Sequence, residues 1–111
     1  MDLWTANPRV VSRDQILKSD CVVIARRLEK QGRVEVERVL AGDVAPGEEL
    51  RVANLSGAAR WDDGRPRILA LSRSRRGYVV TELPGQQAGP LIYPAEPGVI
   101  DEIKAILREG L

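Results

Sequence analysis

The sequence predicts a mainly β domain, in which a small antiparallel β-barrel carries a short N-terminal helix and an amphipathic C-terminal helix. Three observations predict this fold. Apolar, β-branched runs alternate with turn residues throughout residues 20–55, which is the pattern of a strand meander. Further apolar runs, at residues 67–72, 78–82 and 91–93, are separated by turn and loop residues. Apolar side chains then recur at helical spacing in residues 97–109. An open antiparallel sheet packed on the C-terminal helix is the alternative architecture.

The meander begins with residues 21–28, a nearly continuous apolar run that predicts a strand buried on both faces for much of its length. Gly32 belongs to the turn that follows, where it can adopt a positive φ. In residues 34–37 valine and glutamate alternate, which predicts one buried face and one solvated face. The alternation breaks at Arg38, and a β-bulge that inserts one extra residue would restore the register. Leu50 resumes the alternation after two turns that contain glycine.

The run V-E-V-E-R-V-L-A-G-D, followed by P-G-E-E-L-R-V, resembles the first hairpin of bacterial domains related to the netrin-like and metalloproteinase-inhibitor-like (TIMP-like) OB-fold superfamily. The preceding segment S-D-C-V-V-I-A-R is similar to the strand that enters this hairpin. The resemblance covers residues 19–55, with weaker support from residues 77–80 and 92–106. It implies a single OB-like (netrin-like) domain over residues 1–111, in an exported or cell-envelope protein of a bacterium.

Protease inhibition does not follow from this resemblance. Animal members of the inhibitor family ligate the protease zinc with an N-terminal cysteine that disulfides hold in place. This chain starts with Met1 and Asp2, and its one cysteine is Cys21. The inhibitory residue is therefore missing, and we do not extend protease inhibition to this protein.

Two predicted helices flank the strands. Residues 1–11 show little periodicity and predict an irregular N-terminal arm, in which Trp4 is expected to pack onto the barrel. Ser12 suits an N-cap, and Gln15 stands where a capping box places its glutamine. The C-terminal helix is predicted to begin at Pro97. Its apolar face follows i, i+4, i+7 and i+8 spacing and consists of Val99, Ile103, Ile106 and Leu107.

The composition argues against several classes of function. The chain has 111 residues, which fits one domain, and a net charge of +1, which is too small for bulk attraction to nucleic acid. It has no histidine, so the commonest general base and the commonest metal ligand are both missing. We therefore expect a non-catalytic protein with no cofactor and no metal site. No apolar run approaches the roughly 20 residues of a membrane span, and no signal peptide is visible.

The candidate nucleophile and the acidic groups have simpler explanations. Cys21 lies in an apolar run, where a free cysteine acts as a small hydrophobe, and the chain offers no histidine to activate it. Asp43, Glu48 and Glu49 surround a turn and lack the spacing of a calcium-binding loop. Residues 62–64 indicate a turn rather than a metal site.

A basic segment is the most distinctive surface feature of the sequence. Residues 65–76 contain five arginines, and no acidic residue falls between Asp63 and Glu82. Charge on a strand edge that blocks unwanted pairing is the simplest explanation. Tryptophan and arginine are also enriched at protein interface hot spots. We therefore predict a partner-binding surface composed of Trp61, Arg65, Arg73, Arg75 and Arg76.

The leading functional hypothesis is a non-catalytic protein-interaction module whose partner is an unidentified protein. The alternative is an oligonucleotide- or polyanion-binding OB-fold domain. Such domains combine basic charge with several stacking aromatic side chains, and here only Tyr78 lies on a predicted strand near the basic segment. Nucleic acid is therefore the less favoured partner.

Overall fold

A computed structural model describes residues 11–28, 32–55, 61, 64–82 and 92–110 of the chain. The predicted N-terminal arm at residues 1–11 lies outside this part except for Val11, and so does Trp4. The described elements, in chain order, are α1 (Arg13–Lys18), β1 (Cys21–Arg27), β2 (Arg33–Ala41), β3 (Glu49–Arg51), β4 (Arg67–Ser74), β5 (Gly77–Val80), β6 (Tyr93–Pro94) and α2 (Pro97–Glu109).

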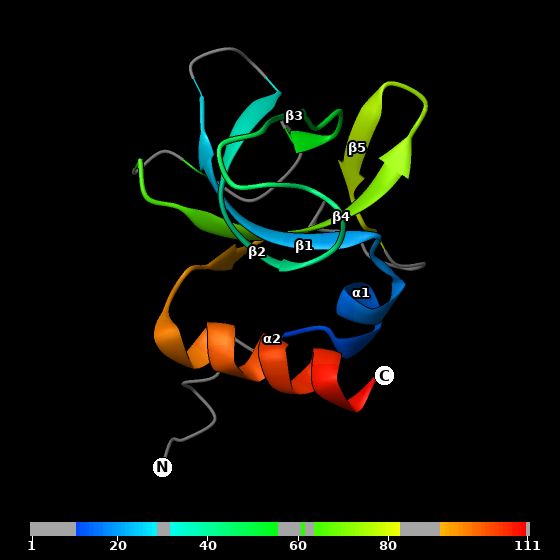
Figure 1. Cartoon of the computed structure of the whole chain (residues 1–111), viewed down its shortest axis with the longest axis vertical. Coiled ribbons are helices and arrows are strands. Elements are labelled where there is room, and N and C mark those ends of the chain that lie inside the picture. Colours follow the sequence, from blue (N-terminus) through cyan, green and yellow to red (C-terminus); the bar gives the residue numbers. More distant parts are fainter. Residues whose placement is uncertain (1–10, 29–31, 56–60, 62–63, 83–91, 111) are drawn as a thin grey trace.

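The strands form one antiparallel sheet in the order β3-β2-β1-β4-β5, and β6 pairs with the beginning of β4. Both helices lie on the same side of this sheet (Figure 1). The prediction of a mainly β fold with a short N-terminal helix and a longer C-terminal helix is confirmed. Within the described residues the paired strands do not close into a barrel. A single parallel bridge between Val52 and Tyr78 joins the two ends of the sheet.

Two apolar clusters lie on opposite faces of the central strands. We name the first the sheet cluster; it consists of Cys21, Val23, Ala25, Val34, Val36, Leu50, Val52, Leu55, Trp61, Leu69, Leu71 and Val80. We name the second the helix cluster; it consists of Val11, Ile16, Val22, Ile24, Ile68, Ala70, Tyr93, Val99, Ile103 and Ile106. Successive residues of β1 and of β4 alternate between the two clusters, because side chains of a strand point alternately to its two faces. The prediction that residues 21–28 form a strand buried on both faces for much of its length is confirmed.

The β2 strand follows the predicted alternation and contains the predicted bulge. Val34 and Val36 are 0% and 1% exposed, whereas Glu37 is exposed to solvent. Ala25 of β1 pairs with Val36, and Ile24 pairs with Arg38, so Glu37 is one extra residue. A second register shift, between Val22 and Val23 of β1, leaves Leu40 as another. The bulge at Glu37 turns the rest of β2 relative to its first half and leaves Val39 partly buried against the sheet cluster.

A buried polar network attaches α1 to the sheet. The Ser12 hydroxyl accepts the amide N–H of Gln15, which confirms the N-cap. The second bond of a capping box, from the Ser12 N–H to the Gln15 side chain, is not formed. The Ser12 N–H instead donates to the hydroxyl of Tyr93, at 3.1 Å. That hydroxyl in turn donates to Gln15 Oε1 at 2.6 Å, and Gln15 Nε2 donates to the carbonyl of Thr81. Gln15 is fully buried, and these bonds compensate for the loss of water around its amide.

The α2 helix has the predicted bounds and the predicted buried face. Val99, Ile103 and Ile106 are buried against the sheet, while Leu107 is only partly buried. Pro97 stands in the first turn, where its missing N–H costs nothing. Part of the strand predicted at residues 91–93 lies outside the described residues, since Leu91 is not among them. Of the described residues there, Tyr93 and Pro94 pair with β4.

Substitutions on the two faces of α2 test this packing. Ile103→Ala should lower the free energy of unfolding by roughly 2–5 kcal/mol, because it leaves a cavity at a side chain that is 0% exposed. Lys104→Ala, on the exposed face, should change it by less than about 0.5 kcal/mol. Urea unfolding followed by circular dichroism measures both. Similar losses in the two variants would contradict the buried face assigned to α2.

Candidate partner-binding surface

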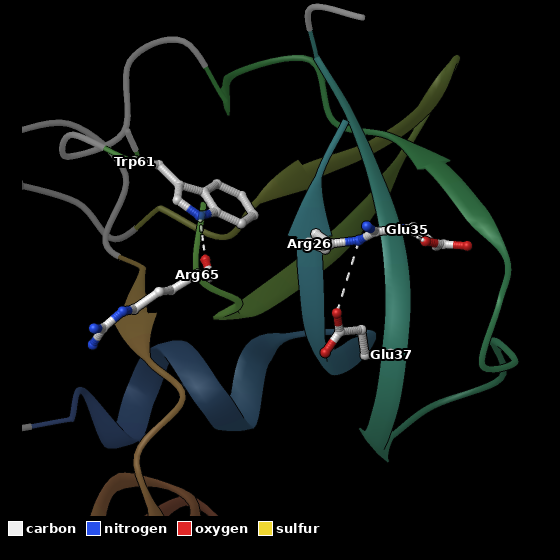
Figure 2. Close-up of polar contacts among 5 residues, drawn as sticks. All are labelled: Arg26, Glu35, Glu37, Trp61 and Arg65. Carbon is white, nitrogen blue, oxygen red and sulfur yellow. Dashed lines mark hydrogen bonds and ion pairs between the residues drawn. The ribbon is translucent and has the colours of Figure 1, made fainter. Parts of the chain in front are cut away.

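Trp61 is a core residue and not an exposed anchor. Its side chain is 5% exposed and belongs to the sheet cluster. The indole N–H donates to the carbonyl oxygen of Arg65 at 2.7 Å (Figure 2), and the carbonyl of Trp61 accepts from Arg27 Nη1 at 2.7 Å. A buried indole with its one donor satisfied offers little to a partner. We therefore correct the prediction that the Trp61 side chain contributes to the binding surface.

Arg65 is exposed but lies far from the other predicted arginines. Its side chain points away from the Trp61 ring in Figure 2. Arg65 comes just before β4, whereas Arg73 lies near the other end of that strand. Eight residues at about 3.3 Å each separate the two positions by roughly 26 Å along the strand. The structure therefore divides the predicted surface into two regions, at opposite ends of β4.

Three of the predicted arginines lie together at the far end of β4, and the structure adds a fourth, Arg51. Arg73, Arg75 and Arg76 are all exposed and surround the turn between β4 and β5. Arg51, at the end of β3, also lies beside this turn: a Cβ added at Gly77 would stand 2.7 Å from its carbonyl oxygen. We name these four residues the basic hairpin cluster. Arg51 could not be found from the sequence, because it lies far from the turn along the chain. The two segments are brought together by tertiary contacts such as the bridge between Val52 and Tyr78.

Some arginines elsewhere in the structure form ion pairs with glutamates. The Arg26 guanidinium forms an ion pair with Glu35 and a longer one, at 3.9 Å, with Glu37 (Figure 2). Arg33 pairs with Glu49 at 2.9 Å. The same arrangement joins the two helices, where Arg13 of α1 lies 2.7 Å from Glu109 of α2.

The basic hairpin cluster differs in that its arginines have no ion pair among the described residues. Among the residues that the structure describes, no carboxylate forms an ion pair with a side chain of the cluster. One carboxylate contacts the backbone of the cluster: Asp20 Oδ2 accepts the N–H of Arg73 at 2.7 Å. The guanidinium groups are thus presented to solvent with their donors available. An external anion can bind such groups through paired N–H donors.

Among the aromatic residues that the structure describes, Tyr78 lies beside the cluster. It lies directly opposite Arg73 on the neighbouring strand and is partly buried against the sheet cluster. Burial raises the pKa of its phenol, so the side chain stays neutral at physiological pH. A single, half-buried ring is a poor platform for successive bases. Neither Tyr78 nor Trp61 therefore supplies the aromatic face that single-stranded nucleic acid requires.

Cys21 has the environment of a structural residue. It is 2% exposed, and burial raises the pKa of its thiol to about 11, with a further contribution from the negative charge of Asp20. A neutral, buried thiol is a weak nucleophile. In the described part of the chain, no three Cys, Asp or Glu side chains come together in a way that could hold a metal ion. None of the described helices has the length and apolar character needed to cross a membrane.

No family model, curated protein or solved structure matches this chain. The functional interpretation therefore depends on the chemistry of its own residues.

Substitution of Trp61 should affect folding. Trp61→Ala should lower the free energy of unfolding by roughly 3–5 kcal/mol, because it removes a large buried ring from the sheet cluster. Arg75→Ala, on the exposed turn, should change it by less than about 0.5 kcal/mol. Chemical denaturation measures both variants. A Trp61→Ala protein as stable as the wild type would show that the ring is not part of the core.

Cys21 should make stability depend on alkaline pH. The folded-state pKa of about 11 lies above the reference value of 9.0, so the folded state disfavours the thiolate. The contribution of the buried thiol is complete below about pH 9 and is lost as pH rises towards about 11. The free energy of unfolding should therefore fall across this range more steeply for the wild type than for Cys21→Ala. Parallel slopes would contradict the burial of the thiol.

Proposed function

We propose that this protein is a non-catalytic protein-interaction module that binds an acidic segment of a partner protein through the basic hairpin cluster. The observation that carries the proposal is the concentration of four exposed arginines around one turn. Arg13, Arg26 and Arg33 each pair with a glutamate, whereas the arginines of the cluster have no ion pair among the described residues. In a chain with a net charge of +1, unpaired arginines concentrated on one turn favour a specific local function over general attraction to polyanions.

An OB-like barrel is the architecture that we propose for this module. Three observations support it: the strand order, the parallel bridge between Val52 and Tyr78, and the hydrogen bond from the Ala53 N–H to the Tyr78 carbonyl at 2.9 Å. Together they bring the end of β3 alongside β5, where closure of a five-stranded barrel would occur. The resemblance of residues 19–55 to netrin-like and TIMP-like domains points in the same direction. That resemblance is also the basis for proposing an exported or cell-envelope protein of a bacterium.

Carboxylates are the partner groups that this surface fits. Arginine binds carboxylates with two parallel N–H donors, and it is one of the residue types most enriched at interface hot spots. Four such groups around one turn would contact several acidic side chains on an extended segment. A folded acidic surface or an acidic peptide both meet this requirement.

Oligonucleotide or polyanion binding is the alternative function, and the same positive charge favours it. It would need stacking aromatic side chains as well, and the buried Trp61 and half-buried Tyr78 do not offer them. Polyanion binding should also depend steeply on salt, because it is dominated by the release of counterions. The two functions therefore differ in both their partner and their salt dependence.

The test compares two triple variants that lose the same charge at different places. Arg73→Ala, Arg75→Ala and Arg76→Ala together remove three arginines of the cluster, whereas Arg13→Ala, Arg26→Ala and Arg33→Ala remove three paired ones. Binding of a labelled glutamate-rich peptide, single-stranded DNA and RNA is titrated at low and at near-physiological salt. The cluster variant should weaken peptide binding by roughly tenfold or more, since each exposed charge contact contributes up to about 1 kcal/mol.

The control variant should bind the peptide within about twofold of the wild type, after correction for any change in folding. Arg51→Ala should weaken peptide binding although Arg51 is remote in sequence. Equal losses in the two triple variants would indicate non-specific charge attraction and overturn the proposal. Tight nucleic-acid binding at near-physiological salt, abolished only in the cluster variant, would establish the alternative function instead.

A further inference from the structure

The outer edge of β5 is covered by the residues that follow β3. Val52 forms the parallel bridge with Tyr78, and the next residue, Ala53, donates its N–H to the Tyr78 carbonyl at 2.9 Å. On its other edge β5 pairs with β4 in an antiparallel register. A short segment thus runs beside β5 in the position that a further strand would take.

Asn54 extends this pairing with its side chain. Its Oδ1 atom accepts the N–H of Val80 at 2.8 Å, and its Nδ2 atom donates to the carbonyl of the same residue at 3.1 Å. Nδ2 also donates to Glu82 Oε2 at 2.9 Å. One amide side chain therefore satisfies both backbone groups of Val80, as a residue of a neighbouring strand would do. These reciprocal partners also define which atom of the amide is the oxygen.

The segment covers apolar side chains beneath it. Val52 is 0% exposed and Leu55 is 8% exposed, and both belong to the sheet cluster. Val80 and Cys21 lie in the same cluster. Leu71 of β4 pairs with Cys21 of β1 on one side and with Val80 of β5 on the other. The segment therefore lies over the side of the sheet cluster where the described strands do not close.

We propose that residues 52–55 form a strap over the open side of the sheet, and that the Asn54 side chain is the latch that holds it shut. Release of the latch lets the strap open locally and makes the sheet cluster, to which Cys21 belongs, accessible while the rest of the fold stays intact. The opening is local because the latch joins a side chain to a strand edge. At the start of the strap, the Val52 N–H stays bound to the Gly32 carbonyl at 2.7 Å. The ladders between β1, β2 and β4 do not involve the latch. This inference is independent of the proposed function.

Two neighbouring amides distinguish opening of the strap from unfolding. The Val80 N–H is held by Asn54, whereas the Thr81 N–H donates to the carbonyl of Ala70 at 2.9 Å and depends on β4 instead. Native-state hydrogen exchange resolves such amides individually. In Asn54→Ala, exchange at Val80 should accelerate about tenfold, which is the order of effect expected for one lost hydrogen bond. Exchange at Thr81 should change by less than about twofold.

Cys21 reports on the same opening through its thiol. Labelling of native Cys21 by a thiol reagent should be slow in the wild type, because the side chain is 2% exposed. It should become several-fold faster in Asn54→Ala, with a weak dependence on urea that marks a small opening. Glu82→Ala is the matched control, since it removes one bond of the latch and leaves both bonds to Val80. Its Val80 exchange and Cys21 labelling should stay within about twofold of the wild type.

If Asn54→Ala does not fold, the variant Asn54→Asp provides a second test. The aspartate keeps an acceptor for the Val80 N–H, loses the donor for the Val80 carbonyl, and places a second negative charge beside Glu82. Val80 exchange should accelerate, and the added substitution Glu82→Gln should reverse part of the change. Unaltered Val80 exchange in the variant that folds would overturn the latch. Equal acceleration at Val80 and Thr81, with Cys21 labelling that tracks global unfolding, would overturn the strap as a separate unit.

Discussion

Burial of β1 and β4 on both faces is the constraint on which the rest of the structure depends. These adjacent strands pair from Cys21 to Ala25, and their side chains enter the sheet cluster on one face and the helix cluster on the other. Two apolar faces each require a cover, because apolar surface is stable only when it is removed from water. The helices cover one face. The curved remainder of the sheet, together with Trp61 and residues 52–55, covers the other.

The two covers are held by different chemistry. On the helix side, packing is supplemented by the chain of hydrogen bonds through Ser12, Tyr93, Gln15 and Thr81, which fixes α1 against the end of β5. On the other side, the edge of β5 is completed by two backbone contacts at Tyr78 and by the side-chain amide of Asn54 at Val80. A fully bonded polar network gives a rigid attachment. A closure held by a few bonds at a strand edge opens more readily, and so we expect the two faces of the same strands to differ in local stability.

The arginines on the surface differ in whether they form ion pairs. On β1, β2 and α1, one arginine each forms an ion pair with a glutamate: Arg26, Arg33 and Arg13. At the turn between β4 and β5 no such partner is provided among the described residues, and the approach of β3 adds Arg51 to the group. The resulting basic hairpin cluster is created by the meeting of two distant parts of the chain. It is the basis of the proposed binding of an acidic partner.

The sequence by itself determined the features that depend on local pattern. Alternation in residues 34–37 defined the faces of β2, the break at Arg38 located the bulge, and the spacing of Val99, Ile103 and Ile106 defined the buried face of α2. These are properties of one strand or one helix, and a period of two or of 3.6 residues is visible along the chain. The same pattern could not distinguish an exposed Trp61 from a buried one, because a loop residue has no period.

Only the tertiary structure decided which distant residues meet. It buried Trp61, separated Arg65 from the arginines of the turn, and brought Arg51 beside Gly77. It also redirected Gln15 from the expected capping box into contact with Tyr93 and Thr81. Each of these outcomes depends on strand order and on the path of a connection, which are set by how the two apolar faces are covered and not by the residues adjacent in sequence.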